Sequence, residues 1–296
     1  MTEMSKTVKT KSEPTRTWIL TASCPDRQGI VAGVAGMLTE RRCFIREEAH
    51  HSDQLSDRFF TRVVFHPGAS ETKADFQRAV EELAARFDLS WRLHDVAMKS
   101  RMLLMVSKHG HCLNDLLYRY RAGTLPVEIP AIVSNHPTFE SLADWHGIPF
   151  FHLPVTSETK PAQEAKLLEL VERFEVDLVV LARYMQILSP ELCQALAGRC
   201  INIHHSFLPG FKGARPYRRA AERGVKLIGA TAHYVTPDLD EGPIIEQAVE
   251  RVDHTYDAKQ LAAVGRDIEN VVLARAIQWH VERRVLVADN RTIVFR

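Results

Sequence analysis

From residue 102 to residue 204, strand-sized apolar runs alternate with amphipathic segments, and this alternation restricts the fold more than any other feature of the chain. Strands are predicted at 102–107, 129–134, 150–153, 178–182, 200–204, 228–234 and 243–252. Helices are predicted at 112–120, 139–146, 162–174 and 190–197, with one or two more over 256–282. Short apolar strands that alternate with helices build a doubly wound, mostly parallel α/β sheet. The ligand site of such a sheet lies beyond the carboxyl ends of its strands, near a switch in strand order.

The segment 17–98 shows a different order of elements. Strands are predicted at 18–22, from 44 onwards, at 58–65 and at 89–98. Helices are predicted where apolar residues recur every three or four positions, at 30–38 and 76–87. The resulting order, βαββαβ, is that of a ferredoxin-like unit.

We therefore expect a chain of three parts. Residues 1–16 are polar and basic and lack an apolar segment, which predicts a disordered tail rather than a secretion signal. Residues 17–98 form the ferredoxin-like unit. The polar pair Lys99-Ser100 joins this unit to an α/β domain at 101–296.

The composition argues against several classes of protein. Lys and Arg total 38 and Asp and Glu total 37, so the net charge of +1 provides no bulk attraction for nucleic acid. No apolar run reaches the ~20 residues of a membrane span. The five cysteines form no CxxC pair and no Cys/His ligand spacing, so neither a zinc site nor a disulfide framework is predicted. We expect a cytoplasmic protein without a metal, bound neither to membranes nor to nucleic acid.

The densest group of polar residues lies on the predicted strand that ends at His204. Side chains alternate along a strand, so Asn202 and His204 face one side, whereas Ile201, Ile203 and His205 face away. Asparagine can donate a hydrogen bond to a developing oxyanion, and histidine exchanges protons near neutral pH. Asn202 and His204 are therefore candidate catalytic residues, although most pairs of this kind are structural.

Two loops are predicted to flank this strand end. The loop 236–243 carries two carboxylates beside a Gly-Pro turn, and it is either a solvated acidic turn or the source of a carboxylate that holds His204 as imidazolium. The loop 181–190 is either simple helix-entry packing or, through Met185 and Ile187, an apolar slot for a flat ring. His136, at the end of another predicted strand, is a candidate substrate contact.

Longer motifs carry a resemblance to a known family. They are Asn202-Ile-His-His-Ser-Phe-Leu-Pro209, Lys212-Gly213, Gly229-Ala-Thr-Ala-His-Tyr-Val-Thr236 and Leu239-Asp-Glu-Gly-Pro243. With these motifs the chain resembles the folate-dependent formyltransferases, which include the formyltetrahydrofolate deformylases. The resemblance to the deformylases is closest, through Val106-Ser-Lys-x-x-His111-Cys-Leu-x-Asp115-Leu-Leu117, Ile132-Val-Ser-Asn-His136, Ala182-Arg-Tyr-Met-Gln-Ile-Leu188 and Phe211-Lys-Gly-Ala-x-Pro-Tyr217.

The resemblance implies an enzyme that acts on the formyl group of 10-formyltetrahydrofolate with no cofactor and no metal. It implies that Asn202 and a protonated His204 bind the formyl oxygen, and that Asp240 orients a water or a proton relay. The folate ring is then expected against the loop before Asp240. It is also expected against Arg183, Tyr184, Met185, Ile187 and Leu188.

The ferredoxin-like unit resembles an ACT domain, a regulatory unit that binds amino acids, at Asp26-Arg-Gln-Gly-Ile-Val31. The resemblance implies glycine or methionine as an effector near Asp26, Gly29 and Ile30, where Asp26 also fits the N-cap of the following helix. A dimerisation unit without a ligand is the alternative. We expect a homo-oligomer, either a dimer or a tetramer.

The formyl acceptor distinguishes the members of the family. A glycinamide ribonucleotide enzyme needs a phosphate-binding turn rich in Gly, Ser and Asn. The corresponding turn here, 107–113, has one glycine between His109 and His111, whose side chains narrow the acceptor entrance. Water is therefore the favoured acceptor. The resemblance implies that the formate released supplies purine synthesis and balances the one-carbon folate pool. A transferase with a small amine acceptor and a catalytically idle amino-acid sensor are the alternatives.

Overall fold

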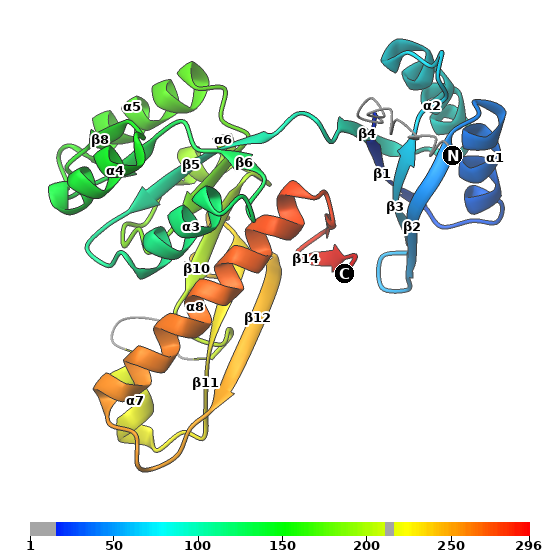
Figure 1. Ribbon diagram of the computed structural model, residues 1–296. Coiled ribbons are helices and arrows are strands. Elements are labelled where there is room, and N and C mark those ends of the chain that lie inside the picture. The colour runs from blue at the N-terminus through cyan, green and yellow to red at the C-terminus, as the bar shows by residue number, and fades with distance from the viewer. Residues whose placement is uncertain (1–15, 211–215) are drawn as a thin grey trace, which may run out of the picture. The chain divides into compact units, whose positions relative to one another are not determined.

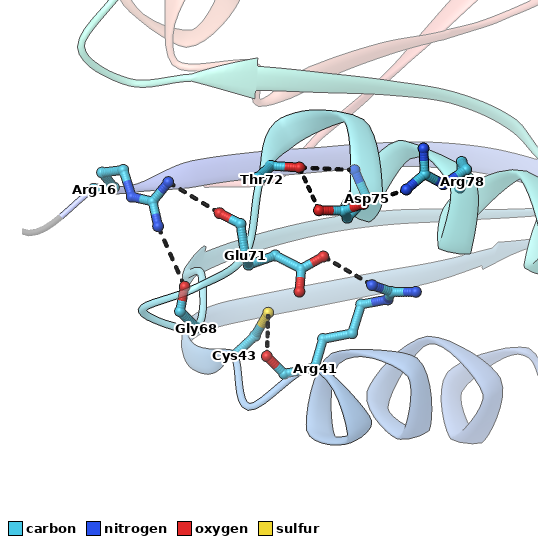
Figure 2. Close-up of polar contacts among 8 residues, drawn as sticks. All are labelled: Arg16, Arg41, Cys43, Gly68, Glu71, Thr72, Asp75 and Arg78. Atoms are coloured by element: carbon cyan, nitrogen blue, oxygen red, sulfur yellow. Dashed lines mark hydrogen bonds and ion pairs between the residues drawn. The ribbon is translucent and has the colours of Figure 1, made fainter.

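The computed structural model describes residues 16–210 and 216–296, and the chain divides between Met98 and Lys99 into two compact units (Figure 1). Most of the predicted tail, residues 1–15, lies outside the described residues. Arg16 belongs to the first unit rather than to a tail, contrary to the prediction. Its guanidinium donates hydrogen bonds to the backbone oxygens of Glu71 (3.0 Å) and Gly68 (3.2 Å), as Figure 2 shows.

The first unit has the element order βαββαβ. Its elements are β1 (Trp18–Pro25), α1 (Ile30–Glu40), β2 (Phe44–Asp53), β3 (Arg58–His66), α2 (Lys73–Phe87) and β4 (Ser90–Asp95). The strands pair antiparallel in the order β2-β3-β1-β4, with Leu20 of β1 opposite Val63 of β3. Both of these residues are buried in one apolar core with Val34 of α1 and Val80 of α2.

Polar contacts fix the turn that leads into α2 (Figure 2). The Thr72 hydroxyl caps the helix by accepting a hydrogen bond from the Asp75 N–H (3.1 Å), and Asp75 forms an ion pair with Arg78. Arg41, directly after α1, forms an ion pair with Glu71 (2.8 Å). The end of α1 is thereby tied to the start of α2.

The second unit begins at Lys99 and is built from alternating strands and helices. Its first half contains β5 (Ser100–Val106), α3 (His111–Arg121), β6 (Val127–Glu128), β7 (Ile132–Ser134), η1 (Pro137–Phe139), α4 (Glu140–His146), β8 (Phe150–His152) and α5 (Lys160–Arg173). Its second half contains β9 (Leu178–Leu181), α6 (Pro190–Ala195), β10 (Cys200–His204), α7 (Pro216–Arg223), β11 (Leu227–Tyr234), β12 (Ile244–Arg251), α8 (Ala258–Val281), β13 (Val285–Ala288) and β14 (Arg291–Val294).

The main sheet of this unit has the strand order β12-β11-β10-β9-β5-β7-β8. The pairs from β10 to β8 are parallel, and β11 and β12 add an antiparallel edge, so the predicted mostly parallel sheet is confirmed. The chain runs from β5 to β7 and β8 and then returns to the other side of β5 as β9. The strand order therefore reverses beside β5, which is where doubly wound sheets bind ligands.

Both faces of the parallel strands are buried. Leu104 and Val180 belong to one apolar core, and their chain neighbours Met105 and Val179 belong to another. Strands that are buried on both faces read as continuous apolar runs, which explains why the sequence reveals them. The polar residues that can act on a ligand therefore lie at the strand ends and in the loops that follow them.

Three parts of the second unit were not predicted from the sequence. Helix α7 is largely charged and has no apolar run to reveal it. Strand β6 has two residues, and β13 and β14 pair only with each other. Conversely, the residues after 256 form one helix, α8, which opens with a capping box between Asp257 and Gln260. In the part of the chain that the structure describes, no helix has the length and apolarity to cross a bilayer.

Candidate active site

A cavity of about 560 Å³ lies beyond the carboxyl ends of β9 and β10. Residues of four loops and of α7 line it, and the catalytic candidates Asn202, His204 and Asp240 are all among them. Asn202 and His204 come from β10, whereas Asp240 comes from the loop between β11 and β12. The structure thus brings together three residues that the sequence places in two separate segments.

His204 and Asp240 form a buried pair. The Nδ1 atom of His204 lies 3.2 Å from Oδ1 of Asp240, so the ring donates its Nδ1–H to the carboxylate. The opposite ring atom, Nε2, is buried without a hydrogen-bond partner within residues 16–210 and 216–296. This arrangement leaves Nε2 as the atom that can act on a ligand.

A tight turn presents the Asp240 carboxylate to His204. Asp240 has a left-handed backbone with φ of 59°, which is unusual outside glycine. Two residues later, a Cβ on Gly242 would lie 1.8 Å from the carbonyl oxygen of Tyr234, so only glycine fits there. The local backbone therefore depends on Gly242, and this accounts for the Gly-Pro turn in the sequence.

His233 of β11 orients Asn202. Its Nδ1–H donates to the Tyr234 carbonyl (2.9 Å), which leaves Nε2 as an acceptor for the Asn202 amide Nδ2–H (3.2 Å). Burial lowers the pKa of His233, so this neutral tautomer persists at neutral pH. One amide hydrogen of Asn202 is then occupied, and the second remains for a ligand.

The charges around the pair keep Asp240 ionised. Burial favours the neutral acid, but the hydrogen bond from His204 and the charge of its ring outweigh burial and hold the pKa of the Asp240 carboxyl below its usual range. An ionised carboxylate at this distance stabilises a positive charge on His204.

His205 lies on the cavity wall, and the prediction that it faces away from the site is wrong. Strand β10 ends at His204, so strand alternation no longer decides the direction of the next side chain. Its ring lies between those of His204 (centroids 5.0 Å apart) and Tyr217 (6.3 Å). Burial, reinforced by the positive charge of Arg183, lowers the pKa of His205 to about 3.

The loop after β9 lines another part of the cavity. Met185 and Ile187 are 52% and 61% exposed, and Leu188 is buried beside them, so the predicted apolar slot is present as a surface. The Ser107 hydroxyl at the end of β5 accepts a hydrogen bond from the Met185 N–H (3.1 Å) and fixes the loop. Tyr184 also borders the cavity, but it packs in the core, and its hydroxyl accepts a hydrogen bond from Gln163 (3.1 Å).

Arg183 differs from the rest of the predicted folate-binding segment. It is 9% exposed, has φ of 65°, and its Nε lies 3.4 Å from the Glu269 carboxylate of α8. Glu269 is fully buried, and it also accepts hydrogen bonds from His111 Nε2 (2.8 Å) and the Tyr217 hydroxyl (2.6 Å). Burial raises the pKa of Glu269, but these donors and the Arg183 charge outweigh burial and keep that pKa below its usual range.

Sequence reasoning missed Glu269, although a signal for it exists. Buried residues recur along α8 at intervals of four, at Leu261, Gly265, Glu269, Leu273 and Ile277. A carboxylate within such an apolar stripe requires buried donors, and it therefore marks a polar site.

His136 is not among the residues that line the cavity, so the structure does not bring this candidate to the site. It follows β7, which is separated from β9 by β5, whereas the cavity lies beside β9 and β10. Its backbone N–H donates to the Ser134 hydroxyl (3.1 Å).

One set of metal-ligand types is grouped among the described residues. Ligand atoms of His111, Cys112 and Glu269 lie within 4.8 Å of one another. Burial raises the pKa of the Cys112 thiol, which keeps it protonated, and a metal binds the thiolate. The Glu269 carboxylate is already hydrogen-bonded, so these residues do not fit a metal.

The candidate effector residues lie at the start of α1. The N-cap is Gly29, with φ of 91° and no side-chain cap, so the prediction that Asp26 caps this helix is wrong. The Asp26 carboxylate instead accepts a hydrogen bond from Ser52 of β2. Ile30 is buried in the core of the first unit.

Comparison with known proteins identifies the family. Residues 100–277 match the formyl transferase family. The formyltetrahydrofolate deformylase of Corynebacterium sp. (strain P-1) is 50% identical over 279 residues, which cover 94% of this chain and 98% of that relative. The chain belongs to the formyltetrahydrofolate deformylase family.

Solved structures agree with this deformylase assignment. The deformylase of Burkholderia mallei ATCC 23344 has a TM-score of 0.91 and 55% identity, and the match covers 95% of this chain and 100% of that one. Glycinamide ribonucleotide transformylase 1 from Symbiobacterium toebii has a TM-score of 0.63 and 30% identity, and covers 67% of this chain and 95% of its own. The predictions of an enzyme and of a formyltransferase-type α/β fold are therefore confirmed.

Proposed function

We propose that this chain hydrolyses 10-formyltetrahydrofolate to tetrahydrofolate and formate. The observation that carries the proposal is the meeting of Asn202, His204 and Asp240 at one cavity, with an amide hydrogen and the His204 Nε2 atom left for a ligand. Two hydrogen-bond donors beside a carboxylate are the groups that acyl transfer to water requires. The named activity of the deformylase relatives supports the same substrate.

In the proposed reaction, a water oxygen attacks the formyl carbon, and the carbonyl oxygen becomes an oxyanion. Asn202 and the Nε2–H of protonated His204 donate hydrogen bonds to this oxyanion. Asp240 accepts the Nδ1–H of His204 and stabilises the imidazolium, while its carboxylate orients the attacking water.

The tetrahedral intermediate then collapses with cleavage of the bond between the formyl carbon and N10 of the folate. His204 delivers a proton to N10, directly or through water, and the proton that the attacking water gives up restores the imidazolium. The formic acid released loses its proton to become formate. One water is consumed, one proton is released overall, and no electrons are exchanged. The reaction therefore needs no redox or group-carrying cofactor.

The apolar surface after β9 is proposed to hold the folate ring. Met185 and Ile187 offer apolar area next to the reacting groups, and Leu239 precedes Asp240 in the facing loop. Backbone groups of the same loop can bond the polar edge of the ring, as apolar slots with a few polar groups do in ligand sites generally.

The first unit is proposed to be an ACT-type regulatory domain that binds glycine or methionine and joins copies of the chain into a dimer or tetramer. Its βαββαβ order and the sheet order β2-β3-β1-β4 support this proposal. Formate from the reaction is proposed to feed purine synthesis and to balance the one-carbon folate pool.

Incubation of the purified protein with 10-formyltetrahydrofolate alone tests the proposed activity. Stoichiometric formate and tetrahydrofolate are expected without any added amine. Formyl transfer that appears only when an amine is supplied would assign the chain to the transferases instead. Binding of glycine or methionine without any turnover of the folate would assign it to the idle sensors.

A further inference from the structure

Four elements of the second unit meet at a single carboxylate. Glu269 of α8 accepts hydrogen bonds from His111 of α3 and Tyr217 of α7, and it faces Arg183 after β9. Figure 1 shows α3 and α7 against different parts of α8, and both contact it. We refer to Arg183, His111, Tyr217 and Glu269 as the Glu269 group.

The Glu269 group forms part of the wall of the catalytic cavity. Arg183 and Tyr217 line that cavity together with His204, and the His205 ring bridges Tyr217 and His204. The wall is therefore continuous from the reacting histidine to Glu269. Arg183 and Tyr217 contribute long polar side chains to this wall.

Several unfavourable features accompany the position of the Arg183 side chain in this wall. Its backbone is left-handed, its side chain is nine-tenths buried, and its Nη1 has no hydrogen-bond partner among the described residues. A guanidinium normally reaches solvent or a bidentate partner, so this placement costs stability. Features that lower stability and are not needed for the fold are concentrated at functional sites.

We propose that Arg183, anchored by Glu269, determines the acceptor by filling the space that a nucleophile larger than water would occupy. The inference rests on the proposed hydrolysis and explains why water is the acceptor. An amine acceptor requires room for its carbon substituents beside the formyl carbon, whereas water requires one oxygen atom. Arg183 acts by occupying this space and takes no part in bond making.

The proposal predicts a new reaction when the wall is shortened. Glycine tolerates φ of 65°, so Arg183→Gly removes the side chain without straining the backbone. The nitrogen of an added amine then attacks the formyl carbon, the bond to N10 breaks, and the amine proton ends on N10. The products are an N-formyl amine and tetrahydrofolate.

The test measures the ratio of N-formyl product to formate with hydroxylamine and with glycinamide as acceptors, in the full-length protein. We expect this ratio to rise at least tenfold in Arg183→Gly over the wild type, and more for glycinamide than for hydroxylamine because of its size. The matched control is Arg183→Met, which removes the charge and keeps most of the bulk. Its ratio is expected to stay near that of the wild type.

The ratio is independent of overall turnover, so a merely structural loss of activity does not move it. Should Arg183→Gly fail to fold with Glu269 left unpaired, the double variant Arg183→Gly/Glu269→Gln removes both charges and is tested in its place. An unchanged ratio in the folded variant would overturn the proposal, as would an equal rise in Arg183→Met. Absence of formate from the wild type would overturn the proposed function itself, which is a distinguishable result.

Discussion

Two polar groups border the same cavity, and each is built around one carboxylate, Asp240 in the first and Glu269 in the second. In the first group, Asn202, His204 and Asp240, polar hydrogens and the His204 Nε2 atom remain for a ligand. In the second, the Glu269 carboxylate is fully buried and accepts two hydrogen bonds from side chains of other helices. The contrast teaches that a carboxylate close to a reaction site can hold a reacting group, as Asp240 holds His204, or can hold part of the cavity wall, as Glu269 holds Tyr217.

The largest expected effect comes from substitutions in the first group, Asn202, His204 and Asp240. His204→Ala and Asn202→Ala are each expected to lower turnover by about 10²-fold or more, because each removes a donor to the oxyanion. Steady-state formate release measures this loss, and circular dichroism checks the fold. His254→Ala, at an exposed position outside the cavity, is the matched control and should keep wild-type turnover. Near-normal turnover in both site variants would contradict the catalytic role of Asn202 and His204, which sets the first group apart from the second.

Asp240→Asn is expected to lower turnover by about 10- to 100-fold, because the amide neither stabilises the imidazolium nor orients water as a carboxylate does. The lowered pKa of Asp240 adds a prediction for the wild type. The carboxylate stays ionised as pH falls toward 4, so any loss of rate between pH 7 and 5 belongs to another group. If the rate and the pH–rate profile of Asp240→Asn both match those of the wild type, the proposed role of Asp240 is contradicted.

His205 lies between the two groups and is expected to affect stability. Its pKa is near 3 in the folded chain, well below the ordinary 6.5, so the unfolded chain binds its proton first as pH falls. Its contribution to stability is complete above about pH 6.5 and is lost as pH falls toward 3. His205→Gln is therefore expected to lose less stability between pH 7 and 4.5 than the wild type, measured by urea unfolding at both values. An equal loss in the two proteins would show that His205 is not held neutral.

The smallest expected effect concerns the packing of the Glu269 group. A Cβ on Gly265 of α8 would lie 2.1 Å from the Tyr217 hydroxyl, so Gly265→Ala must displace Tyr217 from Glu269. We expect a loss of about 1–3 kcal/mol in the free energy of unfolding. Gly36→Ala in α1, where a Cβ meets nothing within 4 Å, is the control and should gain up to about 1 kcal/mol. Equal melting temperatures for the two variants would contradict tight packing at Gly265.

Much of the second unit follows from the sequence because its strands are buried on both faces. Strand β10 has the predicted ends, and Asn202 and His204 line the cavity as predicted, although Ile203 between them also borders it. The rule of alternation fails at His205 because the strand stops one residue earlier. Helix α7 escapes prediction because it has only eight residues, and four of them are charged.

The Glu269 group could not be predicted from the sequence alone. Glu269 and Arg183 are 86 positions apart in a chain of 296 residues, and no local pattern specifies that they meet. Periodicity identifies Glu269 as a charge on a buried face. Its two hydrogen-bond donors and its ion-pair partner Arg183 come from three other elements, whose approach depends on how the helices pack. The sequence analysis does single out the turn with His109 and His111, and His111 proves to be one of these donors.

The central claim is that water, held beside Asn202, His204 and Asp240, is the formyl acceptor. Single-turnover reaction of the protein with 10-formyltetrahydrofolate in ¹⁸O-labelled water tests it most directly, with formate analysed by mass spectrometry. The account predicts formate that carries one labelled oxygen, formed at a rate that falls by about 10²-fold or more in His204→Ala. Unlabelled formate, or labelled formate formed equally fast by His204→Ala, would contradict it.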